Sequence, residues 1–127
     1  MSFTNFLETE ILDHMFAGAA YTAPGTHYLA LFTAIADGEA GSVTELSGSA
    51  YARQSVAFTT SGNTTSNNAA VEFPTATGSW GTVTHVGVYD ASTSGNLMAY
   101  ATLSSSKAIA TGDVFRVPSG DLDITLN

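Results

Sequence analysis

A histidine and an aspartate, two of the residue types that a catalytic triad combines, lie close together in the stretch GTVTHVGVYD at residues 81–90. The valine-rich composition of this stretch predicts a β-strand, in which side chains two positions apart point to the same face. His85 and Asp90 are an odd number of positions apart, so they point to opposite faces unless a β-bulge shifts the alternation. We therefore expect a core strand here, with Gly81 and Gly87 as positions where bulky neighbours approach the backbone.

The other titratable residues form no pattern typical of an active site or a metal site. His14, His27 and His85 are scattered and cysteine is absent, so a zinc site would need the histidines to converge with a carboxylate in the fold. The acids at 37–39 and 121–123 lack the spaced oxygen ligands of a calcium loop, and solvated turns are the favoured interpretation. No carboxylate pair, nucleophile elbow or phosphate-binding loop is recognisable. We predict no catalytic residues, no cofactor and no metal, hence not an enzyme.

Charge is scarce and strongly acidic in this chain. Three Lys and Arg residues stand against 11 Asp and Glu residues, which gives a formal net charge of -8. Because Lys and Arg supply most of the affinity for phosphates, nucleic acid and anionic membrane surfaces are poor candidates for partners. The N-terminus lacks the basic region of a secretory signal, and no apolar run approaches the ~20 residues that span a bilayer. We expect synthesis in the cytoplasm and no membrane partner.

The N-terminal residues predict a helix from about residue 5 to 17. Asn5 is the expected N-cap, with Glu8 as its capping-box partner, and Gly18 suits the helix end. Its apolar arc is much wider than one stripe and includes Phe3, Phe6, Leu7, Ile11, Leu12, Met15 and Phe16. A helix of this kind packs tightly on its own domain or against a partner, and both alternatives stay open.

The rest of the chain alternates in the manner of short β-strands separated by turn residues. Residues 34–49 are rich in glycine and read as a long exposed loop, residues 61–68 as a turn, and residues 92–96 as a hairpin connection. The expected strands lie at about 26–33, 51–60, 69–73, 82–90, 97–103, 108–109, 113–117 and 122–126.

A chain with about eight strands and a single helix predicts a mainly β fold. No strand–helix alternation suggests a parallel sheet, so we expect an antiparallel β-sandwich, jelly-roll-like in topology, plus one N-terminal α-helix. One domain should cover residues 1–127, with the helical segment at 1–20 and the sandwich at 26–127.

Aromatic residues leave two alternatives open. They could line a sugar-binding surface, or each could fill the core or a contact between subunits. We favour the second alternative, because aromatic residues are prominent both in cores and in subunit contacts. The residues in question are Tyr21, Tyr28, Tyr51, Trp80, Tyr89 and Tyr100. Arg53 lies on a strand otherwise short of charge, so it should pair with an acid of its own chain or of a neighbouring subunit.

Several motifs together resemble those of a family of small tailed-bacteriophage virion proteins, which are often labelled tail fibre proteins. The most specific motif is WGTVTH, and the resemblance covers nearly the whole chain. The motifs are Tyr28 to Thr33 (YLALFT), Thr44 to Arg53 (TELSGSAYAR), Val71 to Pro74 (VEFP), Trp80 to His85 (WGTVTH) and Gly112 to Leu126 (GDVF and GDLDITL).

The resemblance implies a structural protein of the virion, made in the host bacterial cytoplasm. A fibre shaft needs an elongated, repeated segment that this chain lacks, so we expect a capsid cement or decoration subunit that binds the outer capsid surface and stabilises the expanded head. Its expected partners are the major capsid protein and copies of itself, as a dimer or trimer. The alternative is a tail or head fibre module that recognises a host glycan through its tyrosines and residues 34–49. The expected partner contacts are Phe3, Phe6, Leu7 and Arg53.

Overall fold

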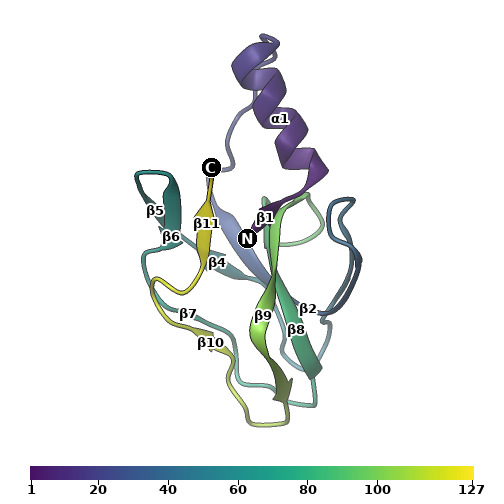
Figure 1. Cartoon of the computed structure of the whole chain (residues 1–127). Helices are drawn as coiled ribbons and strands as arrows, with labels where there is room; N and C mark the ends of the chain where they lie inside the picture. Colours follow the sequence, from purple (N-terminus) through teal and green to yellow (C-terminus); the bar gives the residue numbers. More distant parts are fainter.

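The computed structural model describes all residues, 1–127, as one helix that projects from a body of antiparallel strands (Figure 1). No helix in the structure has the length and apolar character needed to span a bilayer. In chain order the elements are β1 (Ser2–Phe3), α1 (Asn5–Phe16), β2 (His27–Asp37), β3 (Ser42–Glu45), β4 (Gln54–Val56), β5 (Phe58–Ser61), β6 (Thr64–Asn67), β7 (Val71–Glu72), β8 (Gly81–Tyr89), β9 (Leu97–Ile109), β10 (Arg116–Val117) and β11 (Asp123–Thr125).

The strands form one large and two small sheets, which together we call the β body. The large sheet has the order β1-β9-β8-β2-β3, and β4 also pairs with β2. One small sheet joins β7 to β10, and the other has the order β11-β6-β5. In Figure 1 the small sheets lie to the left of β2, β8 and β9, the central strands of the large sheet.

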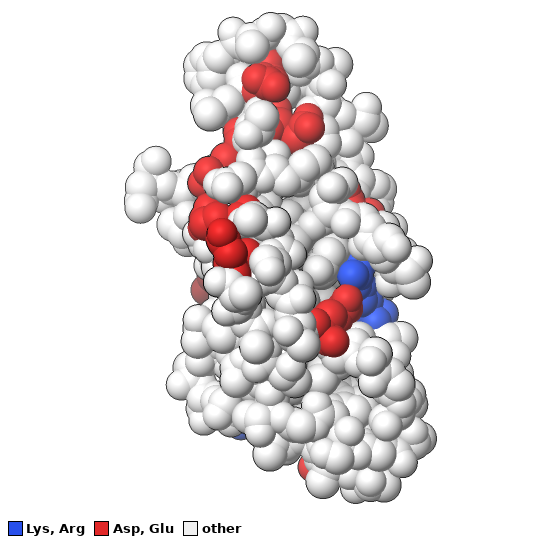
Figure 2. All heavy atoms as spheres, turned by 90° about the vertical axis from the view of Figure 1, so that its right-hand side faces the viewer, with Lys and Arg blue, Asp and Glu red and all other residues white.

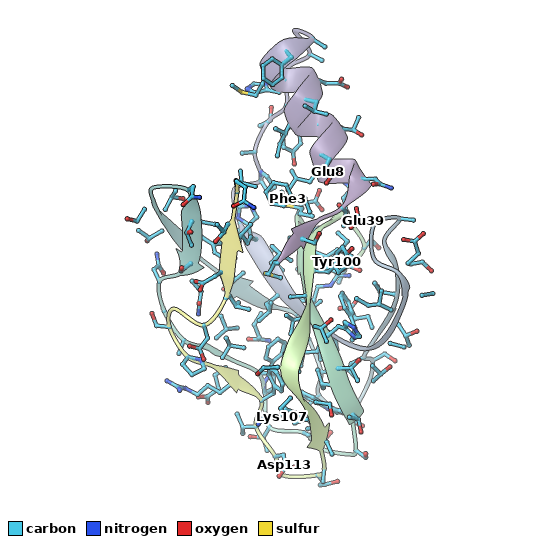
Figure 3. All side chains as sticks on the ribbon, in the orientation of Figure 1. Phe3, Glu8, Glu39, Tyr100, Lys107 and Asp113 are labelled. Atoms are coloured by element: carbon cyan, nitrogen blue, oxygen red, sulfur yellow. The ribbon has the colours of Figure 1, made fainter.

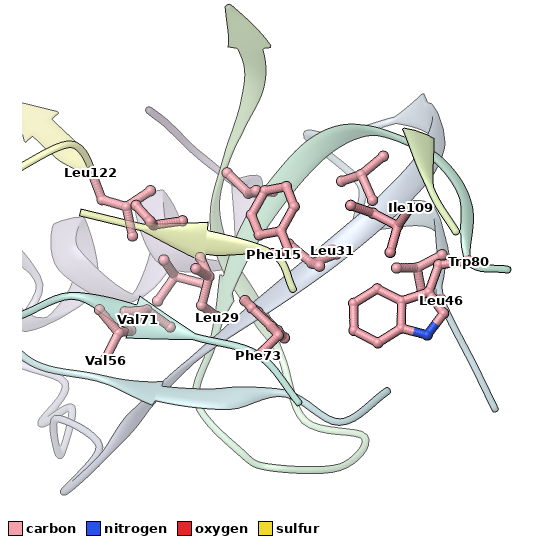
Figure 4. Packing of buried hydrophobic residues seen from close by; sticks show 14 of the residues in the cluster. Leu29, Leu31, Leu46, Val56, Val71, Phe73, Trp80, Ile109, Phe115 and Leu122 are labelled. Carbon is pink, nitrogen blue, oxygen red and sulfur yellow. The ribbon is translucent and has the colours of Figure 1, made fainter. Parts of the chain in front are cut away.

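A cluster of 15 buried residues joins the large sheet to both small ones (Figure 4). β2 contributes Leu29 and Leu31, and Leu122 joins from just before β11. Phe73 and Phe115 meet edge to face, with ring centroids 5.8 Å apart, an arrangement that the charge distribution of aromatic rings favours. Burial of this apolar area is the main source of stability for a chain without disulfides.

Strand β2 is buried on both faces, as the apolar run at 26–33 predicts. Leu29 and Leu31 belong to the 15-residue cluster, whereas Ala30 and Phe32 belong to a second, smaller cluster. Because side chains alternate along a strand, these two sets cover opposite faces of β2. All four side chains are fully buried.

The two glycines of β8 have different roles. A Cβ atom at Gly87 would lie 2.6 Å from both Phe32 and Leu97, so glycine there permits a close approach, as expected. At Gly81 the nearest such atom, in Thr33, would be 4.0 Å away, and the close approach predicted there is wrong. Gly81 has a φ of +75°, a conformation that glycine adopts without steric cost.

The predicted fold class is confirmed: the molecule is mainly β, its strand pairs are antiparallel, and its only helix is N-terminal. The strand count is 11 rather than about eight. The jelly-roll topology stays a prediction.

Two segments expected to lack regular structure are hairpins. Within residues 34–49, β2 continues to Asp37 and pairs with β3. Within residues 61–68, β6 pairs with β5 across the turn at Gly62–Asn63. These strands are composed largely of Ala, Ser and Thr, so the hydrophobic alternation by which strands are recognised is weak in both.

The expected strands at 97–103 and 108–109 are one strand, β9. Val83 lies opposite Lys107 and His85 lies opposite Thr102, so β9 carries extra residues between these two pairs. Such a bulge interrupts the alternation without ending the pairing, which explains why the sequence suggested two strands. The expected strand at 113–117 is shorter than predicted, because only Arg116 and Val117 pair with a neighbour.

Candidate functional site

The first turn of α1 anchors the helix to the β body. The Thr4 hydroxyl donates a hydrogen bond of 2.6 Å to the Leu97 carbonyl and accepts one of 3.5 Å from the Leu7 N–H. The Asn5 N–H donates to the Glu39 carbonyl at 3.0 Å. Thr4 is therefore the N-cap, and the prediction of Asn5 is wrong. Both residue types can cap a helix, and the bond to β9 selects the threonine.

The far end of α1 presents an exposed apolar surface, the α1 tip, made of Leu12, Met15 and Phe16. Their exposed fractions are 58%, 64% and 83%. The spacing of three and four positions places all three on one helix face. Figure 1 shows this end of the helix standing clear of the strands. Contiguous exposed apolar surface of this kind is typical of a contact site.

The chain returns from the α1 tip along residues 17–26, and this return segment braces the helix. The Tyr21 ring meets the Phe6 ring edge to face, with centroids 6.4 Å apart. The Tyr21 N–H donates to Nδ1 of His14 at 3.1 Å. Helix and return segment together form an arm with contacts of its own, so the α1 tip is held away from the β body.

The predicted contact residues Phe3, Phe6 and Leu7 lie at the base of this arm. Leu7 is buried, and Phe3 and Phe6 are half-buried. Their own chain covers much of their surface, and a partner contact through them stays a prediction. The exposed tip residues lay within the wide apolar arc that the sequence showed, but periodicity alone does not separate the covered part of an arc from the uncovered part.

Arg53 is the centre of a polar group that we call the Arg53 cluster, formed with Glu45, Tyr51 and Tyr89. Its Nε and Nη2 each donate a hydrogen bond of 2.8 Å to a different oxygen of Glu45. The guanidinium carbon lies 3.5 Å from the centroid of the Tyr89 ring. The Arg53 side chain is 7% exposed. Its Nη1 donates to the carbonyls of Ala91 and Ser94.

Tyr51 connects the Arg53 cluster to the core. Its hydroxyl donates to Oε2 of Glu45 at 2.7 Å and accepts from the Leu31 N–H at 3.1 Å. Burial, followed by the bond to Glu45, raises the pKa of Tyr51 well above its usual range. Burial alone would lower the pKa of Arg53, but the hydrogen bonds and the charge of Glu45, together with the nearby tyrosines, outweigh this and raise the pKa overall. Arg53 therefore pairs within its own chain, and a role for it in a partner contact stays a prediction.

His85 and Asp90 are engaged with different partners. Nδ1 of His85 lies 2.7 Å from the Thr84 hydroxyl. The Asp90 carboxylate accepts two hydrogen bonds from Asn96, one from its N–H at 2.7 Å and one from its side-chain amide at 2.9 Å. Asp90 thus closes the turn between β8 and β9, and the two residues form no dyad.

The remaining candidates of the sequence serve in turns and packing. The Asp37 carboxylate accepts from the Ala40 N–H at 3.3 Å, and the Asp123 carboxylate accepts from Ser66. His27 meets Phe58 edge to face. No group of three or more His, Asp or Glu residues is arranged to hold a metal ion.

Most of the aromatic residues pack within the chain, which is the alternative we favoured. Trp80 is buried and its indole N–H donates to the Ser49 carbonyl at 2.9 Å. Tyr51 stacks on Phe73 with a centroid distance of 6.1 Å. The Tyr100 hydroxyl donates to Glu39, a bond that is the main cause of the raised pKa of Tyr100.

A groove of about 390 Å³ opens on the β body between β9 and β10, and we call it the β9–β10 groove. Lys107 and Arg116, both exposed, lie on its rim together with Asp121 and Asp123. Its apolar lining includes Val86, Ala101, Leu103, Phe115, Val117 and Leu122.

A sequence model of the family described as Podophage GP4 fiber I protein gp80 matches residues 2–125. The chain belongs to this family. The match spans both the arm and the β body, so both are parts of the gp80 family pattern. The family is one of phage structural proteins rather than enzymes, and this member is a structural protein of a bacteriophage virion, as the sequence motifs implied. No curated protein matches the sequence.

Proposed function

We propose that this gp80-family chain is a subunit of a virion fibre, attached through its α1 tip to a neighbouring protein of the particle. The observation that carries the proposal is the exposed face of Leu12, Met15 and Phe16 at the end of a braced arm. Burying such a face in a contact removes apolar area from water, at roughly 25 cal/mol per Å². The name of the family, a fibre protein, favours a fibre as the location.

The placement of three aromatic residues favours a role in assembly over recognition of a glycan. Tyr89 and Trp80 are buried, and Tyr51 is committed to Glu45 and Phe73. Sugar-binding surfaces need exposed aromatic faces, which these three do not offer. Residues 34–49, the other part of the expected glycan site, contribute the hairpin of β2 and β3.

Capsid cement is the second candidate, and the shape of the chain favours it. The β body is non-repetitive and short, whereas a fibre shaft needs an elongated, repeated segment. As cement, the same α1 tip would bind the major capsid protein on the outer capsid surface. Many copies would act together, so each contact could be weak.

Localisation on the particle separates the two candidates. Immunogold labelling or electron density of the virion should show a few copies at the tail or neck for a fibre subunit. Many copies spread over the shell would overturn the fibre proposal in favour of cement. Absence from the purified particle would overturn both.

The role of the α1 tip is tested by a tip variant, Leu12→Ser with Met15→Ser and Phe16→Ser, supplied to a phage that lacks the wild-type gene. We expect at least a tenfold drop in copies per particle, measured by quantitative mass spectrometry, because truncating central apolar anchors costs more than about 1 kcal/mol each. The matched control is Leu126→Ser, which changes an apolar residue that is 54% exposed and lies outside the arm. If the tip variant and this control are present in equal copy number per particle, the α1 tip does not attach the chain to the particle.

A further inference from the structure

We propose that the neighbour of the α1 tip is a second copy of this chain, whose β9–β10 groove receives the tip head to tail. This deepens the proposed function and rests on it, because it takes the α1 tip as the attachment element. Two surfaces of the same chain, each without a partner within that chain, are thereby matched.

The groove is suited to an apolar helix end. Its volume of about 390 Å³ lies in the range of roughly 300–1,000 Å³ in which protein cavities enclose ligands. Ala101 and Leu103 on β9 are half-buried and give the groove apolar lining, and Phe115, Val117 and Leu122, mostly covered by the core, form its floor. Side chains of the size of Met15 and Phe16 can therefore lose their water-exposed area there.

The charges of the two surfaces are complementary. The chain has three cationic side chains, and Arg53 is held by Glu45. The other two, Lys107 and Arg116, both lie on the rim of the groove. Lys107 forms no ion pair in the chain, and Arg116 lies 3.9 Å from Glu72, an exposed pair that contributes little.

The arm carries the opposite sign. Glu8 and Asp13 are exposed on α1, and Figure 2 shows acidic atoms gathered over this end of the molecule. Asp121 and Asp123 also line the groove, so an incoming acidic helix would be attracted by the two cationic side chains of the rim and repelled by the two aspartates. Complementary charges of this kind set orientation and association rate more than affinity.

The positions of the two surfaces determine the type of assembly. In Figure 3 α1 extends beyond Glu8 to one end of the molecule, and Lys107 lies toward the opposite end. A contact between two different surfaces is heterologous. If the rotation that relates one subunit to the next brings the last subunit back to the first, a ring forms; otherwise an open row of subunits forms. Either product can form part of a virion fibre.

The first test measures self-association of the purified full chain by sedimentation equilibrium over a range of concentrations. We expect association that weakens with added salt, and at least tenfold weaker association for the tip variant and for a groove variant, Lys107→Glu with Arg116→Glu. Leu126→Ser is the control and should associate like the wild type. Thermal unfolding of each variant confirms that the β body is intact.

A mixing experiment is the decisive test, because only a head-to-tail contact can be complemented. The tip variant keeps a working groove and the groove variant keeps a working tip, so each should be monomeric alone and the equimolar mixture should form a dimer that does not grow further. If the groove variant associates by itself as the wild type does, two α1 helices pair with each other and the inference is wrong. A wild-type chain that stays monomeric at millimolar concentration also overturns it.

Failure of this inference can be told apart from failure of the proposed function. Monomeric wild-type protein together with loss of the tip variant from the particle would leave the attachment role intact and assign the partner to another virion protein. Self-association by tip and groove, with normal occupancy of the particle by the tip variant, would leave the inference intact and remove the attachment role.

Discussion

The Arg53 cluster and the α1 tip lie in the same small chain and differ in how their side chains are accommodated: one buries a charged side chain, and the other exposes apolar ones. In the cluster a buried cation is surrounded by Glu45, Tyr51 and Tyr89, which supply hydrogen bonds and an aromatic face. At the tip the apolar side chains face water, with Phe16 83% exposed. The first arrangement is satisfied within the chain, whereas the second leaves apolar surface exposed to water, which under our proposal a partner covers. We therefore expect stability and interaction to reside in different regions, and substitutions should separate them.

The largest effect should come from breaking the Arg53 cluster. Arg53→Ala removes the cation that neutralises the Glu45 carboxylate, leaves that carboxylate with the Tyr51 hydroxyl as its remaining donor, and leaves the Ala91 and Ser94 carbonyls without their guanidinium donor. We therefore expect the free energy of unfolding to fall by about 3 kcal/mol. Urea denaturation of the purified protein measures this loss. Arg53→Lys is the matched control, because it keeps the charge but not the fork geometry, and it should lose less. A loss below about 1 kcal/mol would mean that the cluster behaves like a surface ion pair.

Tyr51→Phe should have the next largest effect, and that effect should depend on pH. Removing the hydroxyl leaves the Leu31 N–H unsatisfied and should cost about 1–3 kcal/mol at neutral pH. Because the pKa of Tyr51 is raised in the folded state, its contribution is fully present below the unfolded pKa of about 10 and is lost as the pH rises above that value. Urea denaturation at several pH values up to 11 should thus show a smaller alkaline loss in Tyr51→Phe than in the wild type. Parallel curves for the two proteins would contradict the raised pKa.

Thr4→Ala tests the attachment of the arm to the β body. It removes the N-cap of α1 and the bond to Leu97, so we expect a loss of about 1–2 kcal/mol. The loss should be local, and hydrogen exchange should show faster opening of α1 amides than of β8 amides. Thr4→Ser keeps the hydroxyl and is the control. Equal acceleration in α1 and β8 would show that arm and β body unfold as one unit.

Phe16→Ser should have the smallest effect on stability and the clearest effect on association. An exposed side chain contributes little to folding, so the free energy of unfolding should change by less than about 0.5 kcal/mol. Differential scanning calorimetry at low protein concentration, where no association occurs, measures this. A destabilisation comparable to that of Thr4→Ala would mean that the α1 tip packs on its own chain.

The sequence predicted the elements with strong hydrophobic patterns better than the strands made of small and hydroxyl-bearing residues. The apolar run of β2, the strand character of β8 and the helix at the N-terminus are all visible in residue order, because they depend on local periodicity. The hairpins at 34–49 and 61–68 are composed largely of small and hydroxyl-bearing residues, so no alternation marks them. Their strands are defined by backbone hydrogen bonds to neighbours, which every residue type except proline can both donate and accept.

What the sequence determined by itself was the class of protein: an acidic, mainly β virion protein without a recognisable catalytic pattern, identified by motifs that run along nearly the whole chain. The tertiary structure decided which acid Arg53 pairs with, which residue caps α1, and which part of the apolar arc stays exposed. Each of these depends on a contact between distant segments, such as Thr4 with Leu97. Local sequence patterns do not specify which distant groups form contacts. The α1 tip is exposed because the tertiary contacts of the arm hold it away from the β body.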